Sequence, residues 1–311
     1  MTERSLRVGV VTGEDAPDLT ENGRSVLSAL RDRGLAAEPV VWTDDAVDWT
    51  TFDVALVRSC WGYHARIDAF RDWLDAVEDA GTTLLNPGDV VRWNVHKFYL
   101  RDLEATGVPV VPTTWVEQGS DADLAELLRD EGWREAVVKP AVGTSSVGTW
   151  RTSLADAADD QGRFAAAVAD GDLLVQAFAP EVFDGERSLV FFGGEYSHAV
   201  RCVPAEGEFR SHPDYGGTVE PHDPPQALVD DAAAVLRAAR SVLGVDPVDL
   251  PYARVDGIVR GGEFRLMELE LVEPYLNLDV PERGPAALAD AVVDALGVGA
   301  VTATDSSAGS P

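Results

Sequence analysis

The chain has 311 residues, enough for more than one compact unit with its own hydrophobic core. Its 54 acidic residues outnumber its 25 lysines and arginines and give a net charge of -29, which argues against nucleic acid or an anionic membrane as a partner. Since 45% of the residues are hydrophobic, we expect a folded, halophilic protein with an acidic surface suited to high salt. The two cysteines are too few for a disulfide framework and the polar start lacks a signal peptide, so we expect a cytoplasmic location.

The first 93 residues alternate between strand-like and helix-like segments. The apolar runs "LRVGVVTG", "AEPVVW" and "FDVALVRSCW" are typical of buried strands. The segments "GRSVLSALRDRGL" and "RIDAFRDWLDAVEDAG" carry apolar residues at helical spacing and end in glycine. This order predicts βαβ units and an open α/β domain over residues 1–93.

The rest of the chain has a different pattern. Residues 94–172 contain two predicted helices, "NVHKFYLRDLEATG" and "DADLAELLRDEG", followed by a strand. Residues 173–296 are β-rich, with pairs of hairpin glycines at 193–194 and 261–262. Residues 297–311 are small and polar and predict a disordered tail. The fold class that we expect is therefore α/β followed by two α+β subdomains.

The segment "VVKPAVGTSSVGTW" has the GxxxxG spacing of a phosphate-binding loop. Thr149 and Trp150, however, occupy the positions where that motif requires Lys and Ser or Thr, and a strand rather than a helix follows. Two interpretations stay open: a plain hairpin turn, or a mobile loop whose backbone amides cover phosphates. The second would use Gly143, Thr144, Ser145, Ser146 and Val147.

Two lysines and three carboxylates are candidates for binding phosphate and metal. Lys139 lies inside an apolar strand, which is costly unless it meets an anion or extends its ammonium group to solvent. Lys97 lies on the preceding predicted helix, where it could also be an ordinary solvated charge. Asp256 and, two residues apart on one strand face, Glu268 and Glu270 have the oxygen ligands that suit Mg²⁺, although an exposed acidic strand would look the same.

These elements, in this order, resemble the ATP-grasp superfamily, the fold of glutathione synthetase and D-alanine–D-alanine ligase. The resemblance covers roughly residues 1–296 and rests on Lys97, Lys139, "GTSSVG", "LLVQAFAP", "GERSLV", "GEFRSHPDYGG", "RVD" and "MELELVEP". It implies an N-terminal α/β domain and two α+β subdomains that clasp ATP. It also implies that the two lysines hold the α- and β-phosphates while the glycine-rich loop closes over the β- and γ-phosphates.

The resemblance assigns roles to other residues as well. Gln176, Ala177 and Phe178 would run beside the adenine and pair with it through backbone groups, and Glu181 would bind the ribose hydroxyls. Asp256, Glu268 and Glu270 would hold Mg²⁺, with Glu270 where many relatives have asparagine. Arg201 and Arg210 would face the γ-phosphate and the acyl phosphate formed from it, and Arg254 would clamp the same species or a substrate carboxylate.

Within the superfamily, the N-terminal segments look most like the cyclo-ligase branch that forms D-cycloserine from O-ureido-D-serine. Cys60, Gly62 and His96 depart from the residues more common in that branch, so the resemblance carries over the reaction class and not the product. The loop after the third predicted strand would face the acceptor pocket. Its candidate substrate contacts are Arg58, Trp61, Tyr63 and His64, although the aromatic residues could simply cover the sheet.

The function that we expect is an ATP- and Mg²⁺-dependent carbon–nitrogen ligase. It would phosphorylate the carboxylate of a small amino-acid-like substrate for attack by a nitrogen nucleophile. Two alternatives stay open: an enzyme of the same fold that acts as a kinase or modifies a carrier protein, and a nucleotide-binding regulator without chemistry. A homodimer is also possible, because dimers are common in the superfamily.

Overall fold

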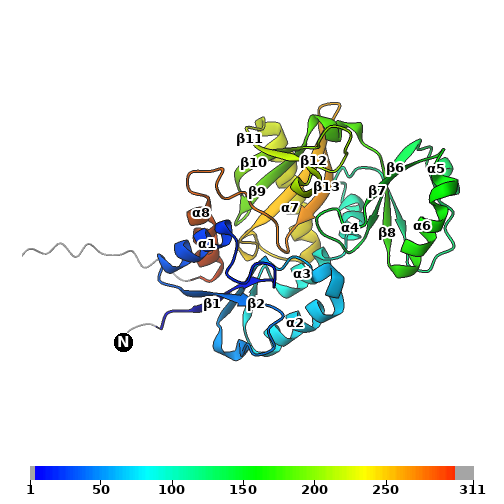
Figure 1. The fold of residues 1–311 in the computed structure, drawn as a ribbon. Helices are drawn as coiled ribbons and strands as arrows, with labels where there is room; N and C mark the ends of the chain where they lie inside the picture. The colour runs from blue at the N-terminus through cyan, green and yellow to red at the C-terminus, as the bar shows by residue number, and fades with distance from the viewer. Residues whose placement is uncertain (1–3, 298–311) are drawn as a thin grey trace, which may run out of the picture.

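The computed structural model describes residues 4–297, which form three β-sheets with helices packed against them (Figure 1). The tail expected from residue 297 onwards lies outside the described residues except for Gly297. No helix among the described residues is both long and apolar enough to cross a membrane.

The N-terminal sheet is parallel, with the strand order β2-β1-β3-β4, as the βαβ pattern predicted. Its elements are β1 (Arg7–Thr12), α1 (Glu21–Arg31), β2 (Ala36–Val41), η1 (Trp49–Thr51), β3 (Val54–Ser59), η2 (Tyr63–Arg66), α2 (Ile67–Asp79) and β4 (Thr83–Leu85). Helix α1 begins where the Thr20 hydroxyl accepts a hydrogen bond from the amide of Gly23. Helix α2 buries Phe70, Trp73, Leu74 and Val77, which share one face at helical spacing. The two helices belong to different hydrophobic clusters, on opposite faces of the sheet.

The second sheet is antiparallel, with the order β5-β8-β6-β7. The elements of this part of the chain are α3 (Gly88–Asn94), α4 (Tyr99–Ala105), β5 (Thr113–Val116), α5 (Leu124–Asp130), β6 (Glu135–Pro140), β7 (Trp150–Ser153), α6 (Ala157–Asp170) and β8 (Leu173–Ala177). Helix α3 contacts α2, and α4 contacts α7 (Gln226–Leu243). Helices α5 and α6 pack against this sheet through a cluster that includes Leu128, Phe164 and Val175.

The third sheet is antiparallel and has five strands in the order β11-β10-β9-β12-β13. The remaining elements are η3 (Pro180–Asp184), β9 (Glu186–Phe192), β10 (Glu195–Val203), η4 (Pro213–Tyr215), β11 (Thr218–His222), α7 (Gln226–Leu243), η5 (Pro247–Asp249), β12 (Ala253–Arg260), β13 (Glu263–Glu270) and α8 (Gly284–Ala295). The predicted hairpin turns are confirmed, because both glycines of each pair have positive φ. Helix α7 covers this sheet, whereas α8 packs beside α1 (Figure 1).

One predicted helix is interrupted. The sequence pattern predicted a helix through "NVHKFYLRDLEATG", but α3 ends at Asn94 and α4 begins at Tyr99. Lys97 lies in the turn between them, where its backbone amide donates to the carbonyl of Ala141 at 2.7 Å. Because this hydrogen bond replaces a helical one, Lys97 is held against the end of β6 instead of on a helix surface.

Candidate functional site

A cavity of about 980 Å³ is lined by residues from the two antiparallel sheets, from the loops around them and from the segment that follows β3. It has the size and the mixed lining that are usual for small-molecule sites. Most of the site residues predicted from the sequence line it, namely Trp61, Tyr63, Lys97, Lys139, Gly143, Thr144, Ser145, Ser146, Val147, Gln176, Ala177, Phe178, Arg210, Arg254, Asp256, Glu268 and Glu270. Four predicted residues are not among the lining residues: Arg58, His64, Glu181 and Arg201.

Both lysines converge on one carboxylate. Nζ of Lys97 lies 3.8 Å from Oε2 of Glu268, and Nζ of Lys139 lies 3.7 Å from Oε1. Burial would raise the pKa of Glu268, but the charges of Lys97 and Lys139 outweigh it and hold the pKa below its usual value. These are the only two lysines in the whole sequence. The solvated-charge and snorkelling interpretations therefore do not describe them, because both ammonium groups are largely buried at the cavity.

The glycine-rich loop is a tight turn with an unusual backbone. Ser145 and Ser146 both have positive φ, at 50° and 56°, which residues other than glycine rarely adopt. Nζ of Lys97 donates to the carbonyl of Gly143 at 2.7 Å, so the loop is tied to the first lysine. Consecutive residues in unusual conformations can direct several amides to one side, as anion-binding nests do. The backbone geometry of this loop is compatible with binding phosphates and also with a plain hairpin turn, so it does not decide between the two interpretations.

The segment predicted to lie beside adenine, Gln176–Phe178, lines the cavity, but two of its backbone amides already donate to other parts of the chain. The amide of Ala177 donates to the carbonyl of Pro112 at 2.8 Å, and that of Phe178 to the carbonyl of Glu135 at 3.0 Å. These two amides are occupied, so any pairing with a base falls to carbonyls of the segment or to Ala179, which also lines the cavity.

Glu181 is directed elsewhere. Its carboxylate receives two hydrogen bonds from the guanidinium of Arg260, at 2.8 and 2.9 Å. The family resemblance assigned Glu181 to the ribose, but the ion pair with Arg260 occupies both oxygens of its carboxylate. The structure therefore does not bring Glu181 to the cavity.

Arg254 forms hydrogen bonds with two carboxylates of the cavity, those of Asp256 and Glu270. Its Nε donates to both oxygens of Asp256 at 3.0 Å, and its Nη2 bonds Asp256 and Glu270. Burial is the main effect that raises the pKa of Glu270, and the charge of Arg254 opposes it. Arg254, Asp256 and Glu270 thus lie together on one side of the β12–β13 hairpin, where Arg254 and Glu270 are directly opposite each other in the strand register.

The carboxylates of the cavity fit Mg²⁺ as partial ligands. Within residues 4–297, no three His, Cys, Asp or Glu side chains converge closely enough to form a complete metal site alone. Mg²⁺ does not need one, because it is usually held by one or two carboxylates together with waters and substrate phosphates. Glu268 and Glu270 line the cavity with partly exposed side chains, whereas Asp256 is almost fully engaged by Arg254. The residues fit the ion, with Glu268 and Glu270 as the more accessible ligands.

The two remaining predicted arginines differ in position. Arg210 lines the cavity, bonded to both oxygens of Glu208 at 3.0 and 2.7 Å and lying 3.6 Å above the ring of Tyr215. Arg201 instead donates to Glu220 on the neighbouring strand β11 at 2.6 Å. Glu220 lines the cavity, whereas Arg201 is paired with it and is not a lining residue.

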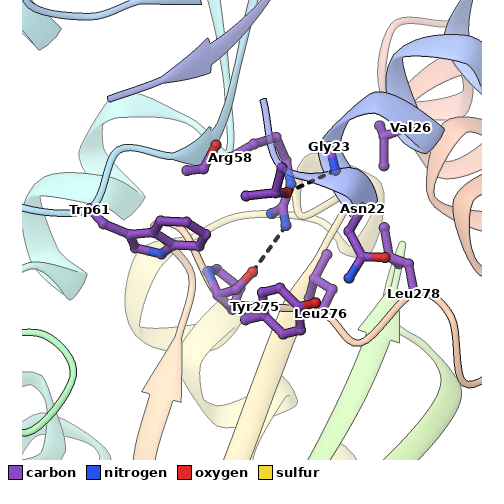
Figure 2. A pocket seen from close by; sticks show the side chains of 11 residues that line it. Asn22, Gly23, Val26, Arg58, Trp61, Tyr275, Leu276 and Leu278 are labelled. Carbon is purple, nitrogen blue, oxygen red and sulfur yellow. Dashed lines mark hydrogen bonds between the residues drawn. The ribbon is translucent and has the colours of Figure 1, made fainter. Parts of the chain in front are cut away.

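The N-terminal loop contributes unequally to the site. Trp61 and Tyr63 reach the cavity, and Nδ1 of His64 lies 2.9 Å from the hydroxyl of Thr144 on the glycine-rich loop. Arg58 lines a separate cavity of about 10 Å³, no larger than a water molecule, beside the start of α1 (Figure 2). There its Nη2 donates to the carbonyl of Pro274 at 3.0 Å.

Sequence reasoning missed several lining residues. Glu186 lies within the quoted segment "GERSLV", and burial, reinforced by Asp256 and Glu268, raises its pKa to about 7. Its carboxylate accepts a hydrogen bond from Ser211 at 3.0 Å. Glu273 and Tyr275 follow β13 and also line the cavity. The run of acidic residues in "MELELVEP" was the available signal for Glu273.

Comparison with known proteins shows relatives for both halves of the chain. Residues 8–86 match the family described as D-cycloserine synthetase DcsG, N-terminal domain, and residues 102–236 match the prokaryotic glutathione synthetase, ATP-grasp domain. The cycloserine biosynthesis protein DcsG of Streptomyces lavendulae is 38% identical over 285 residues, which cover 87% of this chain and 92% of that protein. A glutathione synthetase of Synechococcus elongatus is 29% identical over 60% of this chain and 61% of its own length.

Solved structures give the same result for the fold. The crystal structure of D-cycloserine synthetase DcsG is 32% identical and matches with a TM-score of 0.84 over 93% of this chain and 99% of that one. D-alanine–D-alanine ligase from Bacillus anthracis is 18% identical, with a TM-score of 0.67 over 94% of this chain and 98% of the ligase. The predicted fold class, with a parallel sheet followed by two antiparallel sheets, is confirmed.

Proposed function

Because the chain belongs to the D-cycloserine synthetase DcsG family and has the ATP-grasp fold, we propose that it is an ATP-dependent carbon–nitrogen ligase. Its substrate is a small amino-acid-like acid, whose carboxylate is phosphorylated by ATP and then attacked by an amine or hydroxylamine nitrogen. The products are ADP, phosphate and an amide, which closes a ring if the nitrogen belongs to the same molecule.

The observation that carries this proposal is the convergence of the two lysines on Glu268. A basic pair around one carboxylate, beneath a glycine-rich loop, supports binding of a phosphate chain and its counter-ion. Phosphoryl transfer depends mainly on positioning and charge neutralisation, which these residues supply without a nucleophilic side chain.

The residues divide into three groups by the part of Mg-ATP that they would contact. Lys97, Lys139 and the loop from Gly143 to Val147 hold the phosphates, and the segment from Gln176 to Phe178 borders the base. Glu268 and Glu270, together with Asp256, hold Mg²⁺, which when bound neutralises charge on the phosphate oxygens.

The chemical step takes place near the arginines that line the cavity. A substrate carboxylate oxygen attacks the γ-phosphorus of ATP while the bond between the γ-phosphorus and the leaving oxygen of ADP breaks. Arg210 and Arg254 neutralise charge on the transferred phosphoryl group. The nitrogen then attacks the acyl carbon, phosphate leaves, and the nitrogen loses one proton to the phosphate or to solvent. Arg201 and Glu181, which the sequence suggested for the γ-phosphate and the ribose, have no contact with the cavity that would support these roles.

Several finer expectations remain proposals. The N-terminal α/β domain faces the acceptor side of the cavity through Trp61 and Tyr63. His64 holds this loop against the glycine-rich loop by its contact with Thr144. The division into residues 1–93, 94–172 and 173–296, a possible homodimer and a cytoplasmic location with high salt also remain predictions. ATP supply and reduced thiols at Cys60 and Cys202 suit that location.

The test is ADP release from Mg-ATP in high KCl, with D- and L-amino acids and O-substituted serines supplied singly and in pairs. Release that depends on one acyl substrate, with an amide product, supports the ligase. A stable phosphorylated product or a modified polypeptide would instead indicate the kinase-like or carrier-modifying alternative. Nucleotide binding without any turnover would indicate a regulator.

A further inference from the structure

Glu273 is a buried carboxylate without a partner. Only 8% of the residue is exposed, yet it lines the large cavity. No donor from residues 4–297 forms a hydrogen bond or an ion pair with its side chain. Four other carboxylates of the cavity do have partners, namely Ser211 for Glu186, Arg254 for Asp256 and Glu270, and the two lysines for Glu268.

Such a group is unfavourable unless something pairs with it. Burial, reinforced by the neighbouring charge of Glu270, raises the pKa of Glu273 to about 8. The charges of Arg254 and Arg58 oppose this shift but form no hydrogen bond with the carboxylate. The carboxylate oxygens of Glu273 are not among the fully enclosed polar atoms, so they face the cavity. A carboxylate that lines a cavity without a donor from the chain is a candidate for binding a cationic or hydrogen-bonding ligand group.

The position of Glu273 indicates which part of a ligand it would meet. Glu273 lies close enough to Glu270 and Arg254 for their charges to act on its carboxylate, and its own charge acts on Tyr63 across the same cavity. Glu273 is therefore near both the proposed phosphoryl-transfer residues and the N-terminal loop that we propose faces the acceptor.

The segment that carries Glu273 is held in place from the N-terminal sheet. Nη2 of Arg58, at the end of β3, donates to the carbonyl of the next residue, Pro274 (Figure 2). Nη1 of Arg254 donates to the carbonyl of Tyr275 at 2.8 Å. Two arginines thus fix the backbone on the C-terminal side of Glu273, which suits a group that must be positioned before its ligand arrives.

We propose that Glu273 accepts hydrogen bonds from the α-ammonium group of the substrate and so selects α-amino acids over otherwise identical acids without the amine. The proposal rests on the ligase function proposed above. In an α-amino acid the ammonium group is one carbon away from the carboxylate, so a carboxylate at Arg254 places a cation beside Glu273. Arg58 is a positioning residue in this arrangement and does not contact the substrate.

The test compares two compounds that differ only in the amine: O-ureido-D-serine and its des-amino counterpart, 3-(ureidooxy)propanoate. ADP release is measured for the wild type, for Glu273→Gln, and for Glu282→Gln, a control at an exposed glutamate of the following segment. We expect the wild type to prefer the amine. Glu273→Gln should lower kcat/KM for the amine compound by at least about tenfold, the loss of a charge-assisted hydrogen bond, while kcat/KM for the des-amino compound and the KM for ATP change little.

Other outcomes would overturn the proposal in distinguishable ways. Equal losses of kcat/KM for both compounds would assign Glu273 a structural or metal-binding role. A wild type that does not discriminate between the compounds would show that the amine is not recognised. Both outcomes would leave the ligase function intact. If the wild type releases no ADP with either compound, the result would count against ligase activity on this class of substrate and therefore also against the proposed role of Glu273. If Glu273→Gln fails to fold, Glu273→Asp keeps the charge and displaces it, and should impair only the amine compound.

Discussion

The ammonium group of Lys139 lies 3.7 Å from the carboxylate of Glu268, and both residues line the cavity. Lys97 approaches the other oxygen of the same carboxylate at 3.8 Å. Every other basic side chain apart from histidine is an arginine, since the chain has only these two lysines among its 25 lysines and arginines. An ammonium group is a compact charge that fits between phosphate oxygens, so lysine is retained at the positions where we place the phosphates.

This scarcity makes chemical labelling specific. An amine reagent such as trinitrobenzenesulfonate can modify only Lys97, Lys139 and the N-terminal amine. We expect Mg-ATP to slow modification of both lysines by at least about tenfold, because phosphates would cover them. Mass spectrometry of peptides gives the rate at each site, and the N-terminal amine is the internal control. Equal rates with and without Mg-ATP would count against both lysines as phosphate ligands.

Removing either lysine should weaken ATP binding. For Lys139→Met and Lys97→Met we expect the KM for ATP to rise by about ten- to a hundredfold, since each removes a charged hydrogen bond to phosphate. Arg129→Ala removes an exposed cation of α5 and serves as the control for the change in net charge. An unchanged KM in both lysine variants would favour a ligand other than a nucleotide.

Glu268→Gln tests the metal and the chemistry together. The substitution keeps the shape of the side chain and removes the charge that we expect to face Mg²⁺ and both lysines. Turnover should fall by at least about a hundredfold while nucleotide binding persists, because the charge acts mainly during phosphoryl transfer. ADP release and isothermal titration with ATP measure the two effects. A variant with full turnover would exclude Glu268 from the metal site.

The contact between His64 and Thr144 links the N-terminal loop to the glycine-rich loop at 2.9 Å. His64→Gln and Thr144→Val should each reduce stability, and the double variant should lose less than the sum, with a coupling of about 0.5–1.5 kcal/mol. Urea midpoints give the values. Additive losses would mean that the contact does not contribute.

The same contact predicts a pH dependence. Burial, and next the charge of Lys97, lowers the pKa of His64 below its usual value of 6.5, so the unfolded chain binds the proton more readily. The contribution is therefore complete above about pH 6.5 and is lost as the pH falls from there through the pKa of the folded state. Between pH 7.5 and pH 5.5, His64→Gln should lose less stability than the wild type. A wild type and variant with parallel pH profiles would contradict this.

The net charge of -29 predicts stabilisation by salt. At molar KCl the Debye length is about 3 Å, which screens repulsion among acidic surface residues. The midpoint of thermal unfolding should rise between 0.1 M and 2 M KCl, and choline chloride at equal ionic strength should act similarly if screening is the cause. A midpoint that does not change with salt would remove the basis for the halophilic prediction.

Much of the fold could be read from local patterns. The runs around β1 and β3 and the helical spacing of Phe70, Trp73, Leu74 and Val77 depend on which neighbours are apolar, and burial follows from that pattern. Lys139 could be singled out because a lysine inside an apolar strand needs an anion nearby. Glu268 and Glu270 could be assigned to one face of β13 from their spacing alone, because side chains alternate along a strand with a period of two.

The tertiary structure decided which side chains meet. Glu181 and Arg260 are 79 residues apart, and their ion pair withdraws Glu181 from the cavity. Arg201 is paired across the β10–β11 register with Glu220, and the break at Lys97 depends on the carbonyl of Ala141. Glu273 is conspicuous only because the folded chain buries it without a partner. Hydrophobic periodicity is a property of neighbours along the chain, whereas charge pairing depends on strand register and on residues brought together from distant segments, which only the folded chain specifies.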